Sequence, residues 1–274
     1  KHNNAEPDEI VWGRTAFQPF YIYHGDEVSG IGYGIEQVLR RRMPEYDHSQ
    51  MLMNTARVLH QMEVGENVCC TMILRTPDRE EYLAFSLPSL TFPPPAAVVR
   101  RADAARYGEG PISLEQVLER GDVRVAVVER RRYGGRIDEV LERMADTDTL
   151  VEVFSPHMGG QVVEMLLEDR FDMTIAYPME AAREAQELGR EGEVAVIPLA
   201  ENQDYVVGHV ACPKTDWGRS VIARVDAVLA DEVPTKGYLD IFLPYVPRDI
   251  EPEFLRNYHR LLARPALDFE RAAP

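Results

Sequence analysis

The chain has 274 residues, and its 30 Lys and Arg against 46 Asp and Glu give a formal charge of −16. Apolar residues make up 45% and charged residues 28%, as in an ordinary globular protein. Binding to nucleic acid or to an anionic membrane surface needs a basic stripe, so this composition argues against both. No run of 18 apolar residues occurs, so we expect no transmembrane helix. The length allows one large domain or two medium ones.

The first third of the chain alternates between apolar runs of strand length and patterns with a helical period. The predicted strands cover 9–12, 68–74 and 80–85, and the predicted helices cover 35–43 and 54–62. Asn54 stands at the N-cap position of the second helix. The segment Thr91–Pro95 ends in three successive prolines, which exclude a helix and a central strand. We therefore expect the chain to cross into a second lobe at this point.

The rest of the chain repeats this alternation. Ser113 begins a helix, and Gln116 three residues later completes a capping box. The further predicted strands cover 123–128, 150–154, 173–176, 194–199 and 206–211, and the further predicted helices cover 137–144, 161–167, 180–188, 221–229 and 254–262. Strands that alternate with helices indicate α/β layers with largely parallel sheets.

Two changes of pattern, near residues 94 and 205, divide the chain into lobes. Lobe 1 is expected to be discontinuous and to comprise residues 8–94 and 207–274, and lobe 2 to comprise residues 95–206. A chain that leaves the first lobe, builds the second and returns has two hinge crossovers. The cleft between the two lobes is then the expected ligand site.

The three cysteines give no sign of a metal site. Cys69 and Cys70 are adjacent, Cys212 is distant, and no histidine stands at ligand spacing from them. They are either three buried thiols or one long-range disulfide with one thiol left over, and a disulfide would imply an oxidising compartment. We find no phosphate-binding loop, nucleophile elbow or metal cluster, so we expect no cofactor and no enzymatic activity.

A series of motifs resembles a known family, the type II periplasmic solute-binding proteins of the family 3, amino-acid-binding group. The motifs are an FxPF turn, a glycine-rich helix entry and a TPxRE segment that leads into FSLP, at Phe17–Phe20, Gly30 with Gly32, Thr76–Glu80 and Phe85–Pro88. A poorly characterised branch of that group is more similar still, through Val68-Cys69, Arg170-Phe171-Asp172 with Tyr177-Pro178, and the segment Ala211–Gly218. The resemblance covers nearly the whole chain.

The resemblance implies a two-lobed, periplasmic-binding-protein-like α/β fold and a monomer that closes over a small molecule. It further implies an exported, periplasmic protein that delivers its ligand to an ABC permease or reports it to a membrane sensor. The sequence starts at Lys1 rather than Met, so we expect that a leader was removed or that the sequence starts beyond one.

In the family, the Arg of TPxRE pairs with the ligand carboxylate, and Arg79 stands there. A planar guanidinium suits this role because it makes bidentate, charge-assisted hydrogen bonds. The alternative is a surface arginine paired with Asp78, Glu80 or Glu81. Thr71 matches one of the hydroxyl-bearing positions upstream of this Arg.

The chain departs from the family where the ligand ammonium is usually held by two aspartates. Arg14 and Tyr177 stand at about those positions, and neither is an anion at neutral pH. The usual Gly-Thr loop of the second lobe is replaced by three arginines and Tyr133, of which Arg131 is the candidate contact. We therefore expect a more cationic cleft and an anionic or amino-acid-like ligand, although Arg130–Arg132 could instead form a solvated basic patch.

Further expectations concern aromatic contacts and the cysteines. Phe17 and Phe20 at the FxPF turn could sandwich the ligand, as could Tyr133. The two cysteines in the branch motifs, Cys69 and Cys212, imply a disulfide between adjacent strands, with Cys70 left free.

Two other functions remain open at this stage. The chain could be a sensory or accessory module of a signalling system, since a transport protein and a sensor share this fold. A periplasmic enzyme on the same fold would need a placed acid or base, for which Glu129 and His157 are the candidates.

Overall fold

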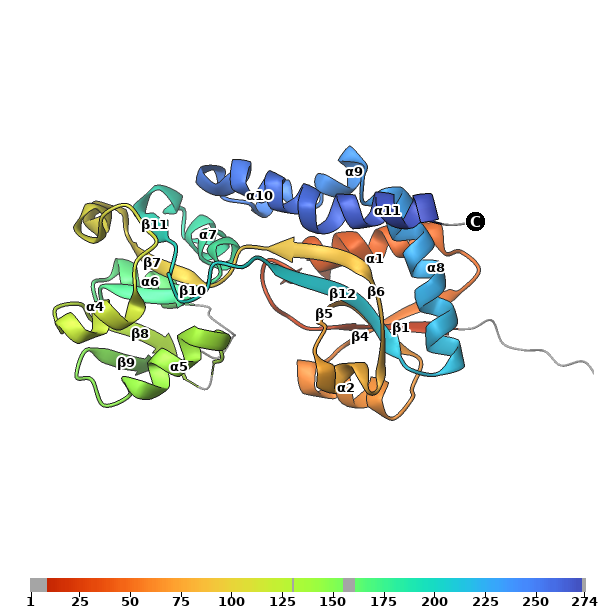
Figure 1. The fold of residues 1–274 in the computed structure, drawn as a ribbon, viewed down its shortest axis with the longest axis horizontal. Helices are drawn as coiled ribbons and strands as arrows, with labels where there is room; N and C mark the ends of the chain where they lie inside the picture. Colours follow the sequence, from red (N-terminus) through yellow and green to blue (C-terminus); the bar gives the residue numbers. More distant parts are fainter. Residues whose placement is uncertain (1–8, 130, 155–160, 273–274) are drawn as a thin grey trace, which may run out of the picture. The chain divides into compact units, whose positions relative to one another are not determined.

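The computed structural model describes residues 9–129, 131–154 and 161–272. These residues form two compact units (Figure 1). The first unit comprises Lys1–Phe92, Val207–Pro244 and Ile250–Pro274, and the second comprises Pro93–Val206 and Tyr245–Asp249. Within the described ranges, no helix is both long enough and apolar enough to cross a membrane.

The first unit is built on a five-stranded sheet whose strand order is β4-β1-β5-β12-β6. The strands are β1 (Glu9–Arg14), β4 (Asp47–Leu52), β5 (Val68–Leu74), β6 (Leu83–Phe92) and β12 (Val206–Pro213). Strands β4, β1 and β5 are parallel, and β12 runs antiparallel to β5. A small hairpin consists of β2 (Ile22–His24) and β3 (Glu27–Ser29).

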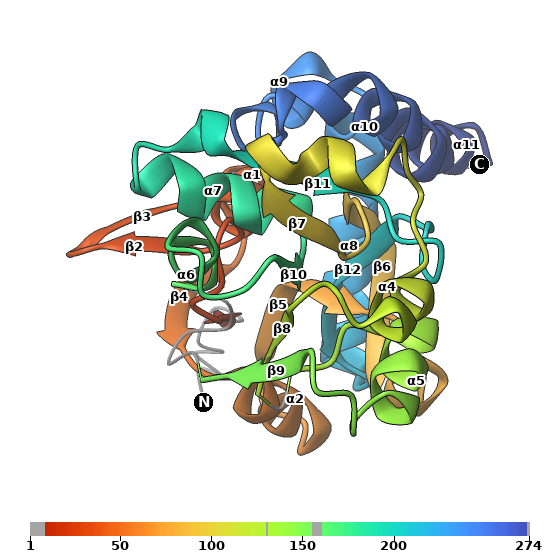
Figure 2. The same cartoon turned by 90° about the vertical axis from the view of Figure 1, so that its left-hand side faces the viewer.

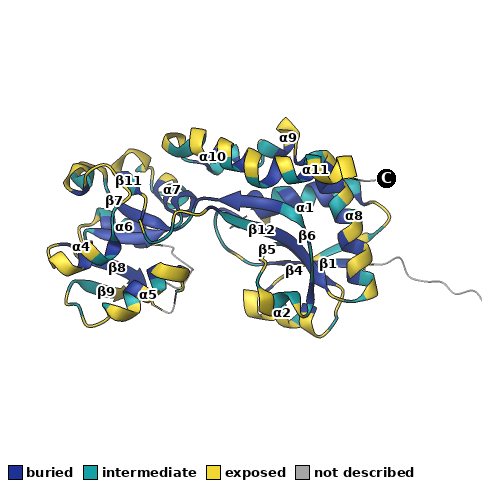
Figure 3. Ribbon diagram, in the orientation of Figure 1, coloured by how far each residue is buried: buried dark blue, intermediate teal, exposed yellow. Residues whose placement is uncertain are grey.

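Helices pack around this sheet, and most of them have a buried side and an exposed side, as the burial colours of Figure 3 show, whereas the short α3 has no buried residue. They are α1 (Ile31–Arg42), α2 (Thr55–Glu63), α3 (Pro77–Glu80), α8 (Asp216–Glu232), α9 (Lys236–Leu239), α10 (Glu251–Tyr258), a π-helical turn (His259–Ala263) and α11 (Arg264–Ala272). The expected cap of α2 is present, because the Asn54 side chain accepts the backbone N–H of Arg57 at 2.8 Å.

The second unit has its own five-stranded sheet, with the order β11-β7-β10-β8-β9. The strands are β7 (Ala96–Arg100), β8 (Val125–Val128), β9 (Leu150–Val153), β10 (Met173–Ala176) and β11 (Val194–Ile197). Strands β8, β9 and β10 are parallel, and β7 is antiparallel to both β10 and β11. The α-helices are α4 (Leu114–Arg120), α5 (Gly135–Arg143), α6 (Val162–Leu167) and α7 (Pro178–Glu187).

Both faces of this second sheet are covered by helices (Figure 2). Val125 and Val127 of β8 belong to the core shared with α4 and α5, whereas Ala126 and Val128 belong to the core shared with α6 and α7. The alternation follows from the two-residue period of a strand. It explains why β8 is apolar throughout, as expected for a strand buried on both faces.

The structure differs from the sequence-based expectation at β4, β6 and β7. Strand β4 has the sequence DHSQML and lies at the edge of its sheet, so it carries no apolar alternation that a sequence pattern could detect. The predicted strand 80–85 is displaced, since a short helix with Pro77 in its first turn comes first and β6 then runs on to Phe92. The sheets are mixed rather than largely parallel, because β7 and β12 run antiparallel to their neighbours.

Candidate functional site

Arg79 lies at the carboxyl end of β5, on the short helix α3. One of its N–H groups, at Nη1, donates to the backbone oxygen of Leu74 at 2.9 Å. The neighbouring Glu80 pairs with Arg75 instead. Within the part of the chain that the structure describes, no carboxylate lies within ion-pair distance of Arg79. A guanidinium carries five N–H donors, so most of the Arg79 donors remain available to a ligand.

The position of Arg79 is one where open α/β sheets bind ligands, namely outside the carboxyl ends of parallel strands. Arg14 ends β1, the strand next to β5, and Leu52 ends β4 opposite Arg14. Leu52 and Leu74 are 58% and 42% exposed, so apolar side chains flank this edge of the sheet.

Arg14 is buried and is neutralised inside the first unit. Its guanidinium donates to both oxygens of Glu36, from Nε at 2.8 Å and from Nη2 at 2.7 Å. Glu36 is fully buried and also pairs with Arg40 at 2.7 Å. The Arg14 guanidinium further lies 5.3 Å from the ring centre of Tyr33. Arg14 therefore holds the interior of the unit together and does not present an unbalanced charge.

Thr71 is also part of this buried network. Its hydroxyl is 2.8 Å from the Tyr21 hydroxyl, which in turn donates to Glu36 at 3.2 Å. Burial, with the nearby Glu36 carboxylate, raises the pKa of Tyr21 well above its usual value, so the phenol stays neutral and can donate. The Thr71 hydroxyl, expected as a ligand contact, thus already has a partner inside the protein.

The two aromatic side chains of the FxPF turn differ in exposure. Phe20 is 2% exposed, and its ring lies 5.0 Å from that of Phe92. Phe17 is half-buried, with its ring 5.4 Å from the Phe20 ring. Of the two, Phe17 is the one whose surface a ligand could reach.

The start of α1 requires glycines because the preceding FxPF turn lies in close contact with the backbone at positions 30 and 32. Gly30 has φ +116°, and a Cβ there would be 2.4 Å from the backbone oxygen of Phe20. A Cβ on Gly32 would be 2.6 Å from the Tyr21 ring. These two glycines let α1 sit close enough to bring Glu36 to Arg14.

The second unit repeats the arrangement of a buried arginine and glutamate. Arg131 follows β8, its side chain is 5% exposed, and it donates to both oxygens of Glu180 at 2.8 and 2.6 Å. Its guanidinium lies 5.2 Å from the ring centre of Tyr133 and 5.7 Å from that of Tyr177. Arg132 instead points to solvent and pairs with Glu142. Arg130 lies outside the described residues, as does the candidate His157.

The two tyrosines of this group differ in how they are held. The Tyr133 hydroxyl accepts the backbone N–H of Val128 at 2.9 Å, and its ring is buried. Tyr177 is half-buried between β10 and the start of α7. Burial raises the pKa of both phenols, so both stay neutral at physiological pH.

The glutamates at 36 and 180 are the partners of these arginines that the sequence analysis missed. Each removes the excess positive charge expected at Arg14 and Arg131. A signal existed for Glu36, because it is an acidic residue next to the apolar positions Ile35 and Val38 of a predicted helix. For Glu180 the signal was its place in the first turn of a helix after Pro178.

The expected disulfide is confirmed. Cys69 of β5 is bonded to Cys212 of β12, and Cys70 is a free, buried cysteine. The register, in which Ala211 lies opposite Cys70, places Cys212 opposite Cys69. Burial raises the pKa of the Cys70 thiol to about 11, so it is not a reactive thiolate.

A half-buried carboxylate in the second unit connects α7 to α6. Glu184 accepts the backbone N–H of Val163 at 2.9 Å and that of Glu164 at 3.3 Å, both in the first turn of α6. Burial raises the pKa of Glu184 to about 7. The ionised form is therefore less favourable in the folded protein than in the unfolded chain, and folding stability falls as the pH rises from about 4.5 to about 7.

Glu184→Gln is expected to remove this pH dependence, because the amide oxygen keeps an acceptor for α6 but does not titrate. We expect the free energy of unfolding of the variant, relative to that of wild type, to rise by about 2–3 kcal/mol between pH 5 and pH 8. Urea unfolding at both pH values measures this. Glu187→Gln, which removes a surface partner of Arg183 on the same helix, should change stability equally at both. A stability difference between wild type and Glu184→Gln that does not change with pH would contradict the raised pKa of Glu184.

Comparison with known proteins gives structural likeness only. No protein-family model matches the chain, and no curated protein matches it. A putative L-cystine ABC transporter from Listeria monocytogenes is similar in structure with a TM-score of 0.64 and 13% identity, over 88% of this chain and 97% of that one.

Two further solved structures are similar over most of their length. One is an ancestral amino acid-binding protein, a precursor of cyclohexadienyl dehydratase, with a TM-score of 0.62 and 15% identity over 87% of this chain and 96% of that one. The other is a histidine kinase sensor domain with similarity to periplasmic binding proteins, with a TM-score of 0.61 and 16% identity over 87% and 96%. This chain therefore has the two-lobed α/β fold of the periplasmic solute-binding proteins.

Proposed function

We propose that this chain is an extracytoplasmic solute-binding protein that closes over a small carboxylate for ABC-type uptake or for sensing. The observation that carries the proposal is Arg79, a partly exposed guanidinium at the carboxyl end of β5 with one donor used and, among the described residues, no carboxylate partner. Such a group recognises a carboxylate through bidentate, charge-assisted hydrogen bonds. Closure around the ligand follows if the closed form binds it more tightly than the open form.

The charges of the other arginines narrow the ligand class. Glu36 neutralises Arg14, and Glu180 neutralises Arg131. Neither position therefore carries the uncompensated positive charge that would favour a ligand with several negative charges. A ligand with a single carboxylate, such as an amino acid or a related small acid, suits the remaining guanidinium best. The similar structures named for L-cystine transport and amino-acid binding support this class.

A sensory role is the second candidate, favoured by the similar histidine kinase sensor domain. Both roles need the same ligand-binding step, and they differ in the membrane partner that reads the closed form. Catalysis is not part of the proposal. Glu129, one candidate acid or base, is exposed, and His157 lies outside the described residues.

Arg79→Ala is expected to abolish ligand binding without unfolding the protein, because the side chain is partly exposed and makes one backbone hydrogen bond. A ligand present at 100 times its Kd adds about 2.7 kcal/mol of stability. For a chain of this size that raises Tm by about 5–8 °C. A thermal-shift screen of amino acids, small monocarboxylates, dicarboxylates and phosphorylated metabolites measures the effect in both proteins.

Arg143→Ala is the matched control, since Arg143 is an exposed arginine that pairs with Glu115 on the surface of the second unit. It should keep the full ligand-induced shift. A shift of equal size in Arg79→Ala would place the ligand elsewhere, and no shift with any compound would contradict the proposed function.

A further inference from the structure

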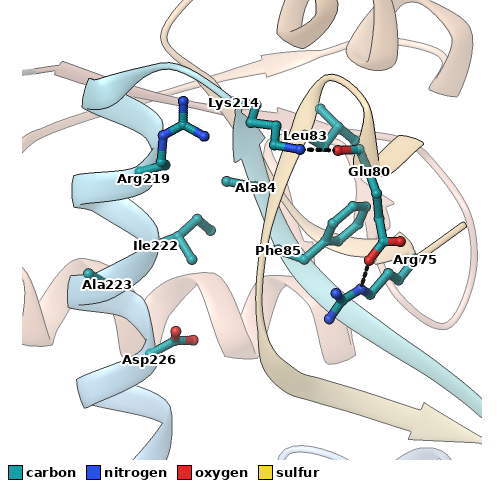
Figure 4. A pocket seen from close by; sticks show the side chains of 10 residues that line it. All are labelled: Arg75, Glu80, Leu83, Ala84, Phe85, Lys214, Arg219, Ile222, Ala223 and Asp226. Carbon is teal, nitrogen blue, oxygen red and sulfur yellow. Dashed lines mark hydrogen bonds and ion pairs between the residues drawn. The ribbon is translucent and has the colours of Figure 1, made fainter. Parts of the chain in front are cut away.

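The first unit contains a groove that is distinct from the residues of the proposed ligand site (Figure 4). It lies between the N-terminal half of α8 and the beginning of β6, and its volume is about 380 Å³. That volume lies within the range of small-molecule sites in proteins, roughly 300–1,000 Å³. None of the candidate contacts of the proposed site lines this groove.

The groove carries opposite charges at its two ends. Arg219 and Asp226 both lie on α8, seven residues apart, which places them about 10 Å apart along the helix axis. Lys214, just before α8, lies at the Arg219 end, as Figure 4 shows, and its Nζ donates to the backbone oxygen of Glu80 at 2.5 Å. In the described ranges, no carboxylate lies within ion-pair distance of Lys214 or Arg219.

Asp226 forms the acidic end, and its carboxylate can accept further hydrogen bonds. Its Oδ1 accepts the backbone N–H of Leu87 at 2.7 Å, and no cationic side chain among the described residues pairs with it. Burial raises the pKa of this carboxyl to about 6. A cationic group placed beside it would offset that cost by favouring the ionised form.

Between the two ends the groove presents apolar side chains together with one ion pair, because Arg75 and Glu80 also line it and pair with each other beside Phe85. Ile222 lies on α8 one turn from Arg219 and one turn from Asp226, so the three side chains share one helix face. Phe85 of β6 faces them from the other side of the groove (Figure 4). An apolar side chain of a ligand would rest on these two residues.

The groove also runs along a free strand edge, because β6 is the last strand in its sheet. The backbone oxygen of Tyr82 accepts the N–H of Lys214 on the β12 side, whereas the N–H of Leu87 points outward to Asp226. Backbone groups alternate in direction along a strand of an antiparallel pair. The N–H and C=O groups of Leu83 and Phe85 are therefore directed, like those of Leu87, toward the groove.

We propose that this groove binds a short zwitterionic peptide that lies extended along the outer edge of β6, with its carboxylate at Lys214 and Arg219 and its ammonium at Asp226. Three extended residues span about 10 Å, which matches the separation of the two charged ends. This orientation makes the peptide antiparallel to β6. A hydrophobic central side chain then contacts Phe85 and Ile222.

The test is calorimetric titration at pH 7.5 with the tripeptide Ala-Leu-Ala, its N-acetylated and C-amidated form, and free leucine. We expect the free tripeptide to bind and the blocked form to bind at least tenfold more weakly. Asp226→Asn keeps an acceptor for Leu87 but removes the charge, and Arg219→Ala removes the other end, so each should weaken binding about tenfold or more. Arg224→Ala, an arginine of the same helix that pairs with Glu45, should have no effect.

Arg79→Ala separates this site from the proposed ligand site. Tripeptide binding that persists in Arg79→Ala supports the groove, whether or not any ligand of the Arg79 site is found. Three results would overturn the proposal: no binding of the free tripeptide, equal binding of the blocked form, or loss of binding in Arg79→Ala with none in Asp226→Asn.

Discussion

Glu36→Gln is expected to lower the free energy of unfolding by about 3–5 kcal/mol, because it leaves a buried guanidinium without its counter-charge. Glu36 is fully buried and compensates both Arg14 and Arg40 while accepting from the Tyr21 hydroxyl. The neutral amide keeps about the same volume, so the loss measures the charge and not a cavity. Urea unfolding at pH 7 gives the value directly.

The matched control for this substitution is Glu142→Gln. Glu142 pairs with Arg132, and the two side chains are 67% and 73% exposed. Exposed pairs contribute little because solvent screens them, so Glu142→Gln should change stability far less than Glu36→Gln. If Glu36→Gln were as mild as the surface control, Arg14 would have to find solvent or another partner, and the proposed neutralisation of Arg14 would be wrong.

Removing the disulfide with Cys69→Ala and Cys212→Ala together is expected to cost about 2–5 kcal/mol. The bond closes a long segment of chain, with a sequence separation of 143, so it restricts the unfolded ensemble strongly. Denaturant unfolding of the double variant, compared with wild type under oxidising conditions, measures the loss. Adding a reductant should bring wild type close to the double variant.

Cys70→Ala is the control for loss of a buried sulfur alone. Cys70 lies next to the bond but does not take part in it, so its replacement should leave the response to reductant intact. Thiol counting on the denatured, unreduced protein should find one free cysteine in wild type. Three free cysteines, or a stability that reductant does not change, would contradict the disulfide.

The local pattern of the sequence was enough to place the most buried elements. Strands β5 (Val68–Leu74) and β10 (Met173–Ala176) have the bounds that were predicted, because each coincides with a mostly apolar, largely buried run of strand length. The Asn54 cap could likewise be predicted from the sequence, since a cap depends on a contact only three residues away. The disulfide came from motif resemblance, because nothing in cysteine spacing alone distinguishes Cys69 from Cys70.

The edge strand β4 was harder to predict from the sequence, for a physical reason. Strand β4 is polar over its first four residues and is held by pairing with β1 rather than by a buried face of its own. Strand β4 forms because it pairs with β1, in which Glu9 lies opposite Asp47, 38 residues later in the chain. A local sequence pattern holds no information about a partner at that distance.

The sequence by itself determined the α/β layering and the position of Arg79 in its motif, whereas the pairing of Cys69 with Cys212 followed from the motif resemblance. Only the tertiary structure decided which arginines carry usable charge. Arg14 and Glu36 are 22 residues apart, and Arg131 and Glu180 are 49 apart, so their pairing arises from how helices dock on sheets. Because burying a lone charge costs far more than burying a paired one, the fold neutralised these two arginines and left Arg79 with its donors at the carboxyl end of β5.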